Sequence, residues 1–150
     1  MAPSTLHRAT LLTAALSTIL LQLALWKAHP RPWLQVGGLA LVLAISVVAG
    51  RWFNAKQGSR IHPLMIVTLI VLWLMPLAAE PVLRAMFGLG NPWELVIVVS
   101  LRNAMWGLAA VRNHQVCQRM ACAASFFLAM FAFTLHFSLF SSVLIGLYSI

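Results

Sequence analysis

The residue with the sharpest chemical meaning in this sequence is Arg102, which stands beside Asn103 near the middle of an apolar run over residues 93–111. An arginine at the centre of a membrane-length apolar helix costs about 2.5–3.5 kcal/mol on insertion scales, so such a residue is by default a functional candidate. Its possible ionic partners are the only two acids of the chain, Glu94 and Glu80. These four residues form the candidate polar or ion-pair site inside the membrane.

Three interpretations of Arg102 remain open. It lines a polar path for a solute, it belongs to an ion pair that joins two helices, or its long side chain reaches from the apolar region to the interface. Glu80 and Glu94 flank a Gly/Pro connection near the expected membrane edge. The chain therefore has no series of acids along the spans of the kind that is typical of proton transport. The pattern therefore favours the two structural interpretations.

Residue combinations typical of catalysis or metal binding do not occur in this sequence. The five histidines fall in five separate places and form no H-x-x-x-H or H-x-x-E pair, which would put two ligands on one helix face. Cys117 and Cys122 are not spaced as C-x-x-C, and no nucleophile has a positioned base. We therefore expect no catalytic residue, no metal, no cofactor and no enzymatic activity.

The composition indicates an integral membrane protein. Hydrophobic residues make up 62% of the 150 residues and charged residues 8%, whereas a soluble domain has about 25% charged residues. The net charge of +8 comes from Lys and Arg scattered between apolar runs. A nucleic-acid-binding face would cluster them on a soluble surface, so the bilayer, and not a nucleic acid, is the expected partner.

The apolar runs predict an all-α bundle in one transmembrane domain, with five transmembrane helices and a truncated sixth. Each helix needs about 20 apolar residues to cross the hydrocarbon. The expected spans cover residues 9–26, 33–50, 64–80, 93–111 and 120–137, with a partial span over residues 139–150.

Two features inside these runs predict local irregularity. Pro76 lies within the third run, where proline removes a backbone donor and kinks the helix. Residues 120–150 would make one helix of about 46 Å, which exceeds the bilayer. We therefore expect a break near residues 136–138 and a half-length helix after it.

The loop charges predict the orientation of the chain. Six basic residues fall on the same side as the N-terminus, namely Arg8, Arg51, Lys56, Arg60, Arg112 and Arg119. Three fall on the opposite side, namely Lys27, Arg31 and Arg84. The positive-inside rule then places the N-terminus in the cytoplasm of a multi-pass protein in the plasma or inner membrane. Small residues in the second run, from Gly37 and Gly38 to Gly50, favour close helix packing there.

The C-terminal third resembles the N-terminal membrane region of TgpA-type transglutaminase-like proteins. The residues that carry the resemblance are Ser100-Leu101-Arg102-Asn103, the basic loop over residues 112–119, the Phe/Leu-rich residues 125–132, the turn His136-Phe137-Ser138 and the pair Leu147-Tyr148. The resemblance covers residues 93–150. It implies a multi-span anchor that precedes an extracytoplasmic transglutaminase- or protease-like domain, and that catalytic domain is absent from this sequence.

Three functions follow as hypotheses. The first is a non-catalytic membrane anchor or scaffold of a TgpA-like protein, whose partner is the missing C-terminal domain. The second is a small transporter or channel-like subunit with Arg102 on a polar path. The third is a subunit or assembly factor of a larger membrane complex, with another membrane protein as partner.

Overall fold

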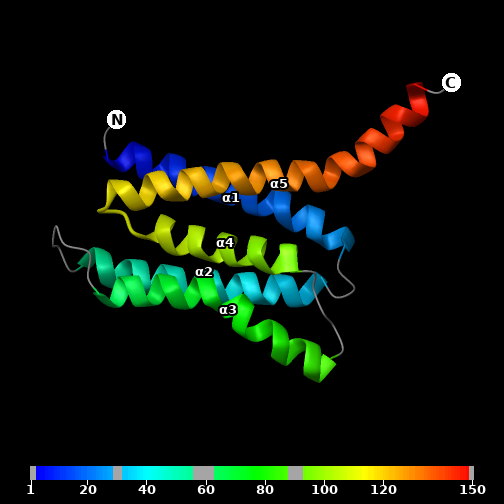
Figure 1. The fold of residues 1–150 in the computed structure, drawn as a ribbon. Coiled ribbons are helices and arrows are strands. Elements are labelled where there is room, and N and C mark those ends of the chain that lie inside the picture. Colours follow the sequence, from blue (N-terminus) through cyan, green and yellow to red (C-terminus); the bar gives the residue numbers. More distant parts are fainter. Residues whose placement is uncertain (1–2, 29–31, 56–62, 88–92, 149–150) are drawn as a thin grey trace.

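The computed structural model describes residues 3–28, 32–55, 63–87 and 93–148, and this part of the chain is all-α. It contains α1 (Pro3–Ala28), α2 (Pro32–Ala55), α3 (Pro63–Phe87), α4 (Trp93–Ala110) and α5 (Gln115–Tyr148) (Figure 1). α1, α2 and α3 each begin at a proline, which suits the first helical position because its missing N–H would have no partner there. The predicted all-α bundle is confirmed.

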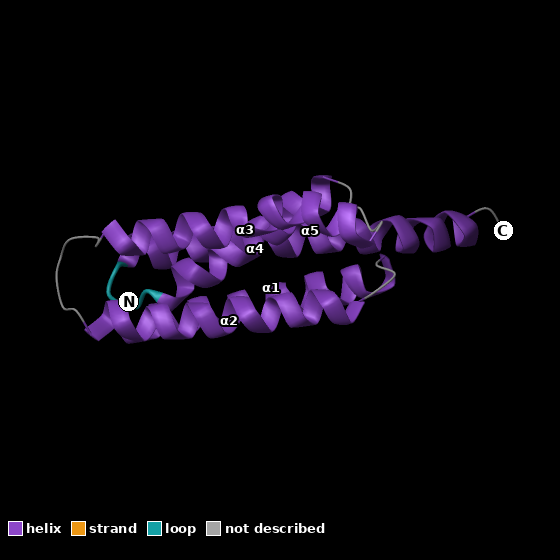
Figure 2. Cartoon of the chain, turned by 90° about the horizontal axis from the view of Figure 1, so that it is seen from below, coloured by secondary structure: helices purple, strands orange, loops and turns teal. Residues whose placement is uncertain are grey.

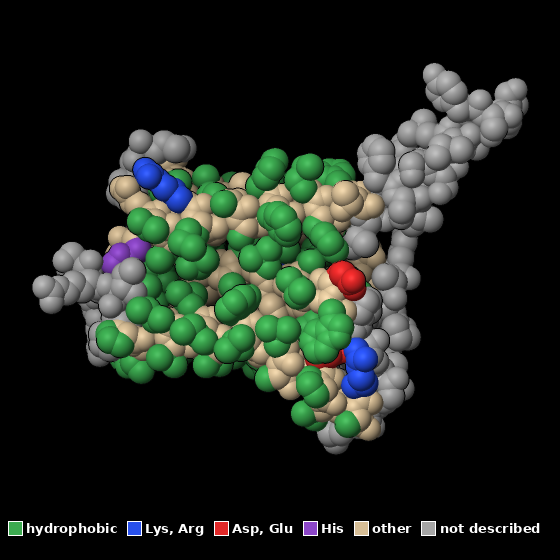
Figure 3. Space-filling model, in the orientation of Figure 1, with side chains coloured by type: hydrophobic (Ala, Val, Ile, Leu, Met, Phe, Trp, Pro, Cys, Tyr) green, Lys and Arg blue, Asp and Glu red, His purple; other side chains and the backbone are tan. Residues whose placement is uncertain are grey.

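Four of the helices are long and apolar enough to cross a membrane: α1, α2, α3 and α5. The protein is therefore embedded in a membrane. On the face that Figure 3 shows, hydrophobic side chains cover the middle of the bundle, and the charged and histidine side chains lie toward its two ends. Such an apolar belt between polar ends matches a bilayer between two aqueous phases.

α4 lies at the centre of the bundle although it is the shortest helix. It contacts all four other helices, and the remaining main contact joins α1 to α5. The helices run side by side along a common direction (Figure 2). Every described side chain from Val98 to Val111 is buried or half-buried, whereas α1, α2, α3 and α5 all carry large exposed apolar side chains. The helix with the most polar middle is therefore the one that the others shield from lipid.

The predicted break in the last helix is wrong. α5 continues without interruption from Gln115 to Tyr148, so residues 139–148 extend the fifth helix and do not begin a sixth. The physical reason is that no proline or glycine stands between residues 120 and 145 to end the helix. Figure 1 shows the orange-to-red end of α5 projecting beyond the other helices.

The third helix also differs from its predicted bounds. It continues past residue 80 through Pro81 and ends at Phe87. Figure 1 shows its second half turning away from the bundle, which is the bend expected of a helix with Pro76 inside it. A neighbouring helix can satisfy the carbonyls that the prolines free, so the helix bends and does not stop.

Two glycines allow α4 to pack closely against its neighbours. A Cβ at Gly50 of α2 would lie 2.8 Å from the backbone oxygen of Ala110, and a Cβ at Gly107 of α4 would lie 2.7 Å from a methyl carbon of Leu69. By contrast, a Cβ at Gly37 or Gly38 would meet nothing within 4 Å. The close approach predicted for the second span is therefore made at Gly50, and not at the glycine pair.

This difference predicts a matched pair of variants. Gly50→Ala should destabilise the bundle by about 1–3 kcal/mol, because its methyl group has no room beside the backbone of α4. Gly37→Ala should be neutral or stabilising by up to about 1 kcal/mol, since it adds a helix-favouring side chain in open space. Unfolding of both variants in detergent micelles measures the difference. Equal losses would contradict the packing at Gly50.

Candidate functional site

Arg102 forms the centre of a buried polar site between α4 and α1. Only 2% of its surface is exposed. Its Nε and Nη2 atoms donate hydrogen bonds to Asn103 Oδ1 over 3.4 and 3.2 Å. Its Nη1 atom donates to Gln22 Oε1 of α1 over 3.3 Å. One guanidinium therefore links two helices that lie far apart in the sequence.

The expected pairing of Arg102 with an acid is not what the structure contains. Glu94 is exposed in the first turn of α4, and eight residues of helix place it about 12 Å along the axis from Arg102. Glu80 accepts a hydrogen bond from Arg84 Nη2 over 3.5 Å, one turn further along α3. Among the described residues no carboxylate lies within ion-pair distance of Arg102. Of the four predicted site residues, the structure brings together only Arg102 and Asn103.

The positive charge of Arg102 is therefore solvated by amides and not balanced by an acid. Amide oxygens accept hydrogen bonds from a guanidinium but carry no net charge. The Nε2 atom of Gln22 is also buried, and it has no hydrogen-bond partner among the described residues. The site consequently keeps a surplus of donors and a net positive charge inside the bundle.

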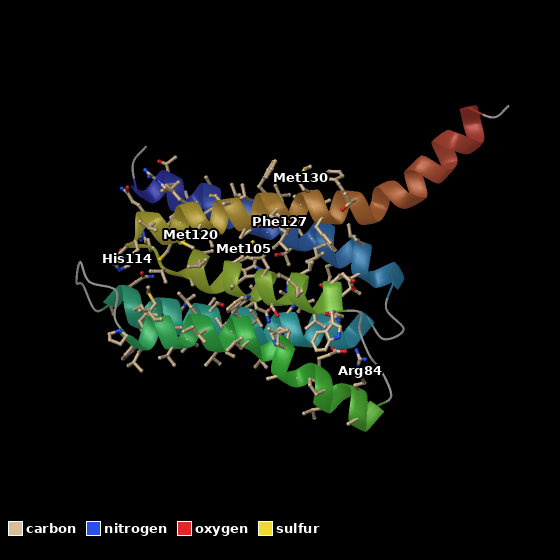
Figure 4. All side chains as sticks on the ribbon, in the orientation of Figure 1. Arg84, Met105, His114, Met120, Phe127 and Met130 are labelled. Carbon is tan, nitrogen blue, oxygen red and sulfur yellow. The ribbon has the colours of Figure 1, made fainter. Side chains whose placement is uncertain are left out.

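A set of smaller polar side chains continues this site along the contact of α1, α4 and α5. Trp106 Nε1 donates to Thr18 Oγ1 over 3.0 Å. The hydroxyls of Ser17 and Ser125 lie 3.7 and 3.1 Å from the sulfur of Met105, and they are also within hydrogen-bond distance of the carbonyls of Ala14 and Ala121 on their own helices. Figure 4 locates Met105 on α4, on the side toward α5. These contacts satisfy hydroxyls that are buried away from water, so they stabilise the three-helix contact.

Sequence reasoning missed the contribution of α1 to this site. The buried residues of α1 are Thr10, Ala14, Ser17, Thr18, Leu21, Ala24 and Leu25, which recur at the three- and four-residue spacing of one helix face. The polar residues on that face, Thr10, Ser17 and Thr18, could have indicated from the sequence that α1 packs against another polar helix face. Gln22, the only amide in the first apolar run, carries the same signal because a polar side chain within the membrane needs a partner.

Two further amides close the end of α4 where the chain turns into α5. Gln118 of α5 is 1% exposed, and its Nε2 atom donates to the carbonyls of Ala109 and Val111. Asn54 of α2 donates to the carbonyl of Ala110 over 3.1 Å. The last carbonyls of a helix lack partners within the helix. Side chains from two neighbouring helices therefore complete the hydrogen bonding of α4.

The same end of the bundle brings together several predicted basic residues. α1 and α5 begin at this end, and α2 and α4 end there. Two contacts show this: His7 of α1 lies 3.3 Å from Gln118 of α5, and Asn54 of α2 accepts a hydrogen bond over 3.0 Å from the backbone N–H of Arg112, just after α4. Figure 4 shows His114 at this end and Arg84 on the outlying end of α3. Arg8, Arg51, Arg112 and Arg119 therefore lie at one end of the bundle, the basic end, and Glu94 lies at the opposite end.

No cluster of metal-binding side chains forms within the described ranges, since no three His, Cys, Asp or Glu residues lie close enough to hold an ion. Cys117 and Cys122 are free thiols. Cys122 contacts Thr10 Oγ1 through its sulfur over 3.3 Å, so it takes part in the packing of α5 on α1. His29, His62 and the side chain of His136 lie outside the described residues.

The chain matches no protein-family model, no curated protein and no solved structure. The case for a function therefore depends on the geometry of the bundle.

The contact between Gln22 and Arg102 predicts an energetic coupling. Gln22→Leu should destabilise the protein by about 1–3 kcal/mol, because the guanidinium loses an acceptor in an apolar surrounding. In the background of Arg102→Met the same change should cost less, since no charge then needs that acceptor. Unfolding of the wild type, both single variants and the double variant in micelles gives the coupling, expected at about 0.5–3 kcal/mol. Additive losses would show that the two side chains do not interact.

Proposed function

We propose that this protein is a non-catalytic membrane scaffold, a helical bundle that anchors or organises a partner at the membrane and carries out no chemistry itself. The observation that carries the proposal is the buried hydrogen bond between Arg102 and Gln22. The buried guanidinium of Arg102 holds α4 against α1, and the other four helices surround α4 and screen this contact from lipid. A bundle built in this way is suited to keep a fixed arrangement of helices.

The enclosure of Arg102 also distinguishes a scaffold from a transporter. A residue on a transport path must meet the solute, yet Arg102 is 2% exposed and each of its three side-chain nitrogens already donates a hydrogen bond. Neither of the two hollows described between these helices is lined by Arg102. The geometry therefore favours a structural role for this arginine.

Within this proposal, the resemblance of residues 93–150 to TgpA-type proteins supplies a specific partner. The scaffold would anchor an extracytoplasmic transglutaminase- or protease-like domain at the cell envelope, in the plasma or inner membrane. The basic end of the bundle would face the cytoplasm, because Arg8, Arg51, Arg112 and Arg119 belong to the helix ends that gather there. α4 would then cross the bilayer as a fifth span inside the other four.

A second candidate function, anion permeation, is favoured by one observation. The Nε2 atom of Gln22 is a buried donor that has no hydrogen-bond partner among the described residues. The oxygen of the same side chain accepts a hydrogen bond from Arg102, whose charge is not paired with a described acid. The two N–H groups of this amide, beside one net positive charge, are suited to a small anion. A rearrangement that opens the contact of α1 and α4 would be needed to admit it.

A co-isolation experiment tests the scaffold, and a matched pair of variants tests anion permeation. Arg102→Gln removes the buried charge, and Arg119→Gln removes an exposed charge at the basic end as the control. For a scaffold, the full chain isolated from its native membrane in mild detergent should carry a stoichiometric membrane or envelope partner. Vesicles that contain the wild type or either variant should then release chloride no faster than protein-free vesicles.

The scaffold is contradicted by a chain that is isolated without any stoichiometric partner. It is also contradicted by chloride release that the wild type accelerates and that Arg102→Gln, but not Arg119→Gln, abolishes. The second result would establish anion permeation in its place.

A further inference from the structure

A groove of about 210 Å³ lies between α1 and α2, with α4 as its floor. α1 and α2 contact one another over only a short stretch, so they leave room between them. The residues that line the groove are His7, Leu11, Leu43, Ser46, Val47, Gly50, Arg51, Asn54, Trp106 and Ala110. Arg102 is not among them, so this groove is separate from the buried polar site.

The groove changes from polar to apolar along its length. His7, Arg51 and Asn54 lie at the basic end of the bundle, and Leu43 lies eight residues earlier in α2 than Arg51. Eight residues of helix correspond to about 12 Å. The groove therefore extends from the end of the bundle into the region where the apolar belt lies, with a cation at its mouth and apolar walls further in.

Arg51 is the side chain at the mouth that is available to a ligand. It is exposed, and it makes no hydrogen bond or ion pair with any described residue. By contrast, Asn54 uses its side-chain oxygen and nitrogen on the backbone of residues 110 and 112, and His7 Nδ1 contacts Gln118. A guanidinium of this kind binds phosphate oxygens well, because its N–H groups match their geometry.

Ser46, which lines this groove deeper in and also lines the small hollow between α2, α3 and α4, carries a donor without a partner among the described residues. It is 2% exposed, and its Oγ atom has no hydrogen-bond partner among the described residues. Other hydroxyls in these helices behave differently: those of Thr10, Thr68, Ser100 and Ser125 each donate to the carbonyl four residues earlier. A buried hydroxyl without an acceptor is costly, so this position calls for an acceptor from a ligand.

We propose that this groove binds an anionic glycerophospholipid of the bilayer. Its phosphate lies at Arg51, an ester carbonyl accepts the hydrogen bond of Ser46, and an acyl chain runs along Leu11, Leu43 and Val47. In such a lipid the ester groups stand between the phosphate and most of each chain. Along α2 the groove presents Arg51 first, then Val47 and Ser46 at nearly the same depth, and then Leu43 one turn further in, so the cation, the hydroxyl and the deeper apolar wall follow the same order.

The size of the groove agrees with a partly embedded lipid. Sites that enclose a small molecule have volumes of about 300–1,000 Å³, and this groove is smaller. It therefore holds part of a lipid, and the remainder stays in the bilayer. Basic pockets between helices on the cytoplasmic side are typical sites of anionic headgroups.

The test uses the full chain in nanodiscs with equal parts of phosphatidylglycerol and phosphatidylcholine. After transfer to detergent, native mass spectrometry counts the lipids of each kind that remain bound. The wild type should retain phosphatidylglycerol over phosphatidylcholine. Arg51→Gln should lower that preference about fivefold, as expected for the loss of one basic residue near the headgroup. The control Arg119→Gln removes the same charge at the same end, outside the groove, and should leave the preference unchanged.

A second measurement locates the lipid without any variant. Phosphatidylglycerol with a diazirine on its acyl chain should form adducts concentrated on Leu11, Leu43, Val47 and their neighbours, and Ser46→Leu should reduce these adducts by filling the groove. The proposal is overturned if Arg51→Gln and Arg119→Gln lower the preference equally, since that indicates surface charge alone. It is equally overturned if phosphatidylcholine is retained as well as phosphatidylglycerol, or if the adducts are spread evenly over the outward faces of α1, α2, α3 and α5.

Discussion

The guanidinium of Arg102 sets the constraint on which this bundle depends. A charged side chain in the middle of an apolar helix cannot face lipid without a large cost, so α4 has to lie where other helices supply acceptors and exclude hydrocarbon. Asn103 on the same helix and Gln22 on α1 supply the acceptors. The surrounding helices supply the enclosure, and their outer faces carry the apolar surface that the bilayer requires. The placement of the helix with the most polar middle at the centre follows from these two requirements.

Close packing and capping then fix α4 in position. Without a hydrophobic force between helices in lipid, association depends on small residues and interhelical hydrogen bonds. Gly50 lets the backbone of α4 approach α2, and Gly107 lets α3 approach α4. At the end of α4, Gln118 and Asn54 take up the free carbonyls. Gln118 and Asn54 each form hydrogen bonds between helices, so the contacts that stabilise the bundle are centred on α4. The groove between α1 and α2 lies at the periphery, where these two helices contact one another over only a short stretch.

The fold class could be predicted from the sequence because composition and apolar run length record the bilayer directly. Arg102 and Asn103 could be singled out for the same reason, since polar residues are costly in an apolar run. Their partner could not. Charge alone pointed to Glu80 and Glu94, whereas the structure uses Gln22, because the side chain that lies closest in a bundle depends on which helix faces pack together. The last helix was predicted to break on grounds of length, yet without proline or glycine over residues 120–145 its backbone hydrogen bonding continues.

The central claim is that α4 lies inside the other helices and is screened from lipid around Arg102. A hydrophobic diazirine reagent dissolved in the bilayer tests it directly, because it reacts only with residues that face hydrocarbon. After photolysis of the full chain in vesicles, peptide mass spectrometry should find adducts on the outward faces of α1, α2, α3 and α5, for example at Leu12, Val48 and Phe126, and almost none between Val98 and Val111. Labelling around Arg102 as strong as that at Val48 would contradict the account.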